Sequence, residues 1–219
     1  MKNYRLDPCN YYTTPGLTGD AGLMKTDVKL ELLSDMDKML FCEKGLRGGI
    51  SMISKRYCKA NNKYLPDYDS TKTTKHILHL DANNLYGWAM SQPLPTGNFN
   101  FEKNVELFTT EYIQSIPDES IKGYFLEVDI ETPEELHEYF NSYPLAPEQI
   151  AIQRDMLSTY QLEIYEKLNG KKVSKTNKIK KLIPNLLPKK NYMIHYRLLK
   201  LYLQLGMKLT KVHRVLSYD

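Results

Sequence analysis

The sequence lacks the cysteine clusters on which disulfide frameworks and most zinc sites depend. Its 219 residues include three cysteines, Cys9, Cys42 and Cys58, an odd number at spacings that match no metal site. Reduced thiols are the simplest account of this pattern, because disulfides persist mainly in oxidising compartments. We therefore expect an intracellular protein.

Long hydrophobic runs are missing as well. No stretch of about 18 apolar residues is present, which argues against a transmembrane helix. The first ten residues, MKNYRLDPCN, contain no apolar signal core, so we expect neither export nor a membrane partner. The hydrophobic content of 42% and the charged content of 26% are those of a globular protein, which at this length buries one sizeable core or forms two small lobes.

The net charge of +4 is modest, but the charges are unevenly distributed. Residues 167–190 contain nine lysines and no acid, whereas residues 127–138 contain six acids and one histidine. A basic segment of this kind attracts phosphate groups and makes binding depend on salt. Most lysine-rich segments are solvated loops, and composition alone favours neither interpretation.

Hydrophobic periodicity predicts a mixture of helices and strands. Helices are predicted over 28–41, 85–90, 102–116, 133–140, 157–168 and 198–205, the last ending at Gly206. Strands are predicted over 50–54, 77–80, 123–130, 192–195 and 207–216. Residues 1–24 are expected to be irregular and 59–75 to form a loop. Because no βαβ rhythm is present, we expect an α+β fold.

One carboxylate stands out at the end of an apolar run. In LHLDANNLYG, residues 78–87, Asp81 follows the predicted strand and Tyr86 comes five residues later. A carboxylate that leaves a buried strand is well placed to hold Mg²⁺, which takes one or two oxygen ligands from protein. The alternative is that Asp81 caps a helix beginning near Asn84, and chemistry alone favours this alternative.

The stretch DANNLYGWAMSQPLP, which begins at Asp81, resembles the first catalytic motif of family B DNA polymerases, D-x-x-S-L-Y-P. It is most similar to the protein-primed branch found in bacteriophages, eukaryotic viruses, linear plasmids and DNA transposons. Asp81, Leu85 and Tyr86 match the motif, whereas Asn84 replaces its serine and Gly87 its proline.

Other segments support this resemblance. LRGGI, residues 46–50, resembles the family's Y-x-G-G element between the exonuclease and polymerase domains, with Leu46 in place of tyrosine. Residues 123–148 and 181–219 resemble the palm and primer-protein-contacting segments of virus- and transposon-type members. The resemblance implies an exonuclease–palm junction over 1–58. It also implies part of a palm domain over 59–219, with the catalytic motif at 77–95 and an inserted subdomain over about 99–190.

The resemblance also implies roles for individual residues. Asp81 would be a catalytic ligand of Mg²⁺, and Leu85 and Tyr86 would bind the incoming deoxynucleoside triphosphate. Arg47, Gly48 and Gly49 would contact the DNA template. The lysine-rich segment would contact DNA or a terminal priming protein through Lys171, Lys172, Lys175, Lys178, Lys180 and Lys181.

Two motifs of the family are absent from the sequence. Neither the D-T-D motif, which carries the second metal-binding carboxylate, nor the fingers motif K-x-x-x-N-S-x-Y-G occurs. The resemblance therefore implies a fragment of a DNA-directed DNA polymerase that is inactive in isolation. It does not distinguish nucleus, virus factory and organelle.

Two other interpretations stay open. The chain is alternatively a non-catalytic nucleic-acid-binding or protein-docking remnant of a mobile element or virus. A third interpretation is a metal-dependent nuclease that uses Asp81 with Asp129, which requires the two carboxylates to lie within a few Å of a bridged metal pair. Glu127, Asp129 and Glu131 share one face of the strand over 123–130, where we expect them to face solvent.

Overall fold

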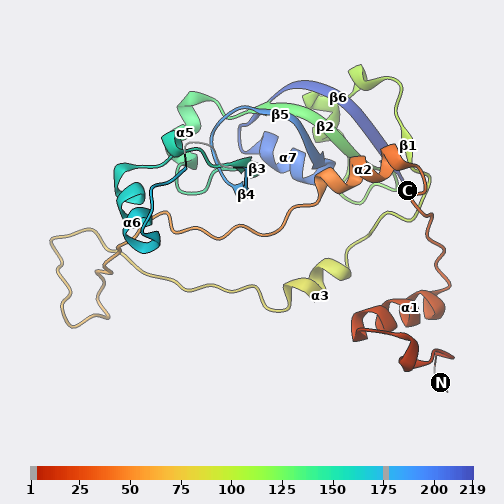
Figure 1. Ribbon diagram of the computed structural model, residues 1–219, viewed down its shortest axis with the longest axis horizontal. Coiled ribbons are helices and arrows are strands. Elements are labelled where there is room, and N and C mark those ends of the chain that lie inside the picture. The colour runs from red at the N-terminus through yellow and green to blue at the C-terminus, as the bar shows by residue number, and fades with distance from the viewer. Residues whose placement is uncertain (1–3, 175–177) are drawn as a thin grey trace.

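The computed structural model, which describes residues 4–174 and 178–219, is an α+β structure with two antiparallel sheets (Figure 1). The larger sheet has the strand order β1-β6-β2-β5 and the smaller one pairs β3 with β4. The strands are β1 (Asn100–Phe101), β2 (Gly123–Glu131), β3 (Glu148–Ala151), β4 (Lys180–Ile183), β5 (Lys189–His195) and β6 (Lys208–Tyr218). The expected α+β class is confirmed.

Seven α-helices accompany the sheets in the described residues. They are α1 (Thr14–Thr26), α2 (Met36–Gly45), α3 (Leu85–Met90), α4 (Thr110–Ser115), α5 (His137–Phe140), α6 (Thr159–Asn169) and α7 (Tyr196–Gln204). Short 3-10 turns occur at Pro8–Asn10, Val105–Leu107, Glu134–Leu136 and Arg154–Met156. Among these described residues, no helix is long and apolar enough to cross a membrane.

The two faces of the larger sheet are covered differently. One face packs Leu126 and Val128 of β2 against α4 and α7, in a core that includes Ile113 and Leu199. The other face packs against α2, whose Phe41 is buried with residues of β5 and β6. Helices α1 and α3 lie apart from the sheet (Figure 1). The sheet and its covering helices therefore form the core, and the segments before residue 99 mostly extend away from it.

Several predicted elements are confirmed, most clearly at the end of α7. Gly206 has a φ of +99°, and the Met207 and Gly206 amides donate to the carbonyls of Tyr202 and Leu203. This pattern is the Schellman motif that a glycine after a helix predicts. Helices α3 and α6, strands β2, β5 and β6, and the loop at 59–75 also lie where the sequence predicts them.

Other predicted elements are wrong at their boundaries. The irregular N-terminal region contains α1, because Pro15 lies in the first helical turn, where proline is tolerated. The helix predicted over 28–41 begins only at Met36, where the Asp35 side chain accepts hydrogen bonds from two backbone amides. The helix predicted over 102–116 is divided into a 3-10 turn and α4 by Thr109, which caps α4.

Two predicted strands are absent from the described structure. Residues 50–54 and 77–80 belong to no described helix or strand, and no described strand pairs with either. The apolar residues of the second segment are exposed, with exposed fractions of 59% for Ile77, 75% for Leu78 and 83% for Leu80. An apolar segment becomes a strand only if the edge of another strand satisfies its backbone hydrogen bonds, and no described strand does so here.

The packing of β2 against β6 predicts that Gly123→Ala destabilises the fold. A Cβ at position 123 would collide with the ring of Tyr218, which is buried. Overpacking of this kind costs about 1–3 kcal/mol of unfolding free energy, measurable by urea denaturation. Gly22→Ala in α1, where a Cβ has no described neighbour within 4 Å, is the control and should not destabilise. Equal stability of Gly123→Ala and the parent would contradict this packing.

Candidate nucleic-acid interface

The acids of the central strand β2 are buried, contrary to the expectation that they face solvent. Glu127 and Asp129 are each 6% exposed, and Glu131 is partly buried. Burying a carboxylate is costly unless donors surround it. The neighbouring strands supply these donors, and two irregularities in strand pairing bring them into position.

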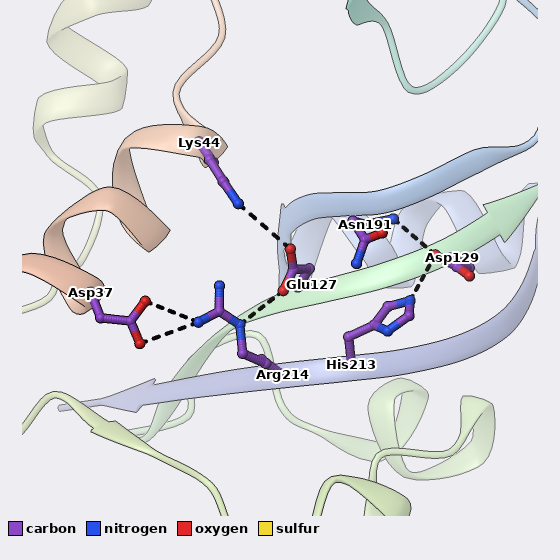
Figure 2. A network of polar contacts seen from close by, with 7 residues as sticks. All are labelled: Asp37, Lys44, Glu127, Asp129, Asn191, His213 and Arg214. Atoms are coloured by element: carbon purple, nitrogen blue, oxygen red, sulfur yellow. Dashed lines mark hydrogen bonds and ion pairs between the residues drawn. The ribbon is translucent and has the colours of Figure 1, made fainter.

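The first irregularity is a bulge in β6. Glu127 pairs with Arg214 and Val128 with Val212, so His213 is an extra residue in the strand. A bulge allows two consecutive side chains to reach the same face. Arg214 Nε therefore donates to Glu127 Oε2 at 2.9 Å, while His213 Nε2 lies 2.8 Å from Asp129 Oδ1 (Figure 2).

The second irregularity lies in β5. Asn191 has a φ of +50°, and its amide donates to Asp129 Oδ1 at 2.8 Å. Lys190 Nζ lies 3.2 Å from Asp129 Oδ2. Burial raises the pKa of Asp129, but the Asn191 amide, His213 and Lys190 outweigh burial and lower this pKa to about 2. Asp129 is therefore a charged carboxylate that joins β5 and β6.

An open groove of about 730 Å³ lies next to this network. It is bounded by the end of α2, by β5 and by residues of the smaller sheet. Its lining includes five cationic side chains and two acidic ones: Lys44, Arg47, Lys180, Lys189, Lys190, Glu43 and Glu148. The groove is therefore basic, and its curvature concentrates the positive potential.

Two lysines of the groove are held differently. Lys189 is buried, its Nζ lies 2.7 Å from Glu148 Oε2, and burial lowers its pKa. Lys190 keeps 71% of its side chain exposed although it contacts Asp129. Lys44 is similar, with 60% of its side chain exposed and its Nζ 3.9 Å from Glu127 Oε1. Lys44 and Lys190 therefore present charge to solvent at the groove.

Arg47 is fixed against the wall of the groove. Its Nη1 donates to the Met193 carbonyl at 2.6 Å, and its guanidinium lies 3.9 Å from the centre of the Tyr192 ring. Gly48 and Gly49 are exposed, neither has a positive φ, and a Cβ at either would meet no described atom within 4 Å. The described fold itself therefore does not require glycine at these two positions.

The lysine-rich segment reaches this groove at one point. Lys180, the first residue of β4, lines it. Lys171, Lys172, Lys178 and Lys181 are exposed, and Lys175 lies outside the described residues. The structure thus brings together Arg47 and Lys180, which the sequence suggested separately.

Asp81, Leu85 and Tyr86 are not part of this groove. All three are exposed, and α3, which follows Asp81, lies apart from the sheet (Figure 1). Asp81 does not cap α3, contrary to the alternative that chemistry alone favoured. Asn84 is the cap, with a φ of +51° and a side-chain oxygen that accepts from the Gly87 amide at 3.2 Å.

Asp81 belongs to no cluster of three or more candidate metal ligands in the described part of the chain. No group of three or more histidine, cysteine, aspartate or glutamate side chains that could hold a metal ion is found there. The residues present therefore do not make up a two-metal site on their own. Asp129 is engaged by His213, Lys190 and Asn191, which argues against a nuclease site shared with Asp81.

Sequence reasoning missed the network of Glu127, Asp129, His213 and Arg214. No sequence pattern around these residues indicates that a bulge in β6 brings His213 and Arg214 to the acids of β2. Comparison with known proteins adds no further assignment: no family model, no curated protein and no solved structure matches the chain.

The lowered pKa of Asp129 predicts how stability depends on acid. A carboxylate whose pKa falls on folding stabilises the protein above its ordinary pKa of 3.8, and this contribution disappears as the pH falls to about 2. Asp129→Asn should therefore lower the unfolding free energy at neutral pH by about 2 kcal/mol and flatten its decline below pH 3.8. Asp155→Asn, at an exposed position, is the control. An Asp129→Asn protein as stable as the parent at neutral pH would contradict the network.

Proposed function

We propose that this chain is part of a DNA-directed DNA polymerase of the protein-primed family B type and that its basic groove binds the DNA backbone. The observation that supports the DNA-binding part is the meeting of Arg47 and Lys180 in one groove. The resemblance of residues 46–50 and 81–95 to polymerase motifs supports the enzymatic part.

The groove suits phosphates for physical reasons. Arg47 presents a planar guanidinium that is already oriented by Tyr192 and Met193, so little side-chain freedom is lost on binding. Lys44, Lys180 and Lys190 add exposed positive charges around it. Gly48 and Gly49, which the described fold does not require, allow a phosphate to approach the backbone closely.

Under this proposal the chain supplies only part of the catalytic site. Asp81 would be one ligand of Mg²⁺, and Leu85 and Tyr86 would bind the deoxynucleoside triphosphate. Because two metal ions need at least a second carboxylate, this ligand would come from another segment of the enzyme. The priming protein would bind near the lysine-rich segment.

The alternative is a remnant that binds nucleic acid or protein without taking part in catalysis. Such a remnant would keep the groove but would not need Asp81. The two functions are therefore separated by variants at the groove and at Asp81.

Charge in the groove should control DNA affinity. Replacing Lys44, Lys180 and Lys190 with glutamine should weaken binding of labelled duplex DNA. It should also reduce the slope of log affinity against log salt by up to about 3. Binding of the variant neutralises fewer phosphates and therefore releases fewer counterions. Anisotropy titrations at several salt concentrations measure both quantities.

The control for this experiment carries the same change of net charge elsewhere. Lys25, Lys103 and Lys122 are exposed and do not line the groove. Their replacement with glutamine should leave the salt slope close to that of the parent. Equal effects of the two triple variants would mean that net charge, not the groove, drives binding.

Asp81 should matter for synthesis but not for DNA binding. We expect no primer extension by the isolated chain with Mg²⁺ and deoxynucleoside triphosphates, because it provides one candidate metal carboxylate where two are needed. In a longer polypeptide that includes the D-T-D and fingers motifs, Asp81→Asn should abolish extension and leave duplex affinity unchanged. Asp27→Asn, at another exposed aspartate, is the control. Near-normal extension by Asp81→Asn would remove the basis for the catalytic assignment.

A further inference from the structure

A loop before the polymerase-like motif has a well-defined internal structure. Residues 59–75 are closed by backbone hydrogen bonds between Asn61 and Lys75, of 3.0 and 2.8 Å. The Asn61 side chain donates to the Asp69 carbonyl and accepts from the Asp69 amide, each at 2.9 Å. Asn62, 7% exposed, donates to the Lys75 carbonyl and accepts from the Tyr64 amide. These bonds hold the loop in one compact shape, as in functional Ω-loops.

The charges of this loop are mostly positive. Its two acids, Asp67 and Asp69, are each 2.8 Å from a lysine, Lys59 and Lys72 respectively. Beyond these two ion pairs the loop contains Lys63 and Lys75, and Lys55 and Arg56 lie just before it. With its acids already paired, the loop presents a net positive surface to an anionic partner.

Exposed tyrosines lie among these cations. Tyr57 is 80% exposed, Tyr64 is 77% exposed and Tyr68 is 41% exposed. Lys63 Nζ lies 5.3 Å from the centre of the Tyr64 ring. Exposed aromatic rings interleaved with lysines are typical of surfaces that bind single-stranded nucleic acid.

We propose that the loop over residues 59–75, together with Tyr57 just before it, binds single-stranded DNA, with Tyr57 and Tyr64 stacking on unpaired bases and the neighbouring lysines contacting phosphates. Duplex DNA does not suit this surface, because paired bases are stacked on one another and their faces are not accessible. The inference adds a second binding site, for single-stranded DNA, to the proposed function. It rests on the proposed function for the identity of the nucleic acid as DNA.

The loop is connected to the lysine-rich segment through α6. The Arg56 guanidinium lies 5.4 Å from the centre of the Tyr160 ring, which belongs to α6 and is 54% exposed. Figure 1 shows the loop extending beyond α6, on the side away from the larger sheet. Lys171 and Lys172 follow the other end of α6, so the helix separates the Arg56–Tyr160 contact from these two lysines.

The test compares aromatic and charged variants of the full chain. The double variant Tyr57→Leu and Tyr64→Leu should bind a labelled single-stranded oligonucleotide at least about fivefold more weakly for each ring removed. Its salt slope should match that of the parent, because no phosphate contact is lost. Its affinity for duplex DNA should be unchanged.

Two controls make the result specific. Tyr57→Phe with Tyr64→Phe keeps the rings and should keep the affinity for single strands. Tyr12→Leu, at a fully exposed tyrosine outside the loop, should have no effect. Circular dichroism verifies that each variant is folded.

The outcomes separate the loop from the groove. If the leucine variant binds single strands as tightly as the parent, the loop proposal is overturned and protein docking is left for this surface. The same conclusion follows if the phenylalanine variant loses as much single-strand affinity as the leucine variant. The loop proposal is supported if the leucine variant loses affinity for single strands only. The groove proposal is rejected if the variant at Lys44, Lys180 and Lys190 has the same duplex salt slope as the parent. Loss of duplex and single-strand binding to the same extent in the leucine variant also overturns the loop proposal.

Discussion

The arrangement of the larger sheet depends on a single buried carboxylate, that of Asp129. It accepts hydrogen bonds from the Asn191 amide of β5 and contacts His213 of β6, so it joins the two strands that flank β2. Both flanking strands are irregular at this point, and irregular pairing leaves backbone and side-chain donors that need an acceptor. A carboxylate accepts from both flanking strands at once, whereas an apolar residue would leave their donors unpaired in a partly buried position.

The same contacts explain why the groove is basic. The buried acids of β2 attract cations from neighbouring elements: Arg214 from β6, Lys44 from α2 and Lys190 from β5. The acids are almost fully buried, but the lysines keep most of their side chains in solvent. Negative charge is therefore placed inside the sheet and positive charge at its surface. The groove therefore presents exposed lysines whose partner acids lie inside the sheet.

Short sequence patterns predicted those helices whose ends are fixed by neighbouring residues. Gly206 ends α7 as a positive-φ residue, and Ser158 begins α6 with a capping box, so both boundaries are set by neighbouring residues. The burial of Glu127 and Asp129 could not be predicted in this way. It depends on a bulge at His213, which alternation alone cannot reveal, and on a lysine and an asparagine more than sixty residues along the chain. The meeting of Arg47 and Lys180 is likewise a consequence of tertiary packing.

The two positions at which residues 81–87 depart from the motif that they resemble are physically linked. Asn84 accepts a hydrogen bond from the Gly87 amide, a donor that a proline at position 87 would lack. A Cβ at position 87 would meet the end of the Asn84 side chain, so Asn84 would have to turn away from the Gly87 amide. Residues 84–87 thus form one closed turn directly after Asp81, held by a hydrogen bond that depends on both Asn84 and the backbone N–H of Gly87.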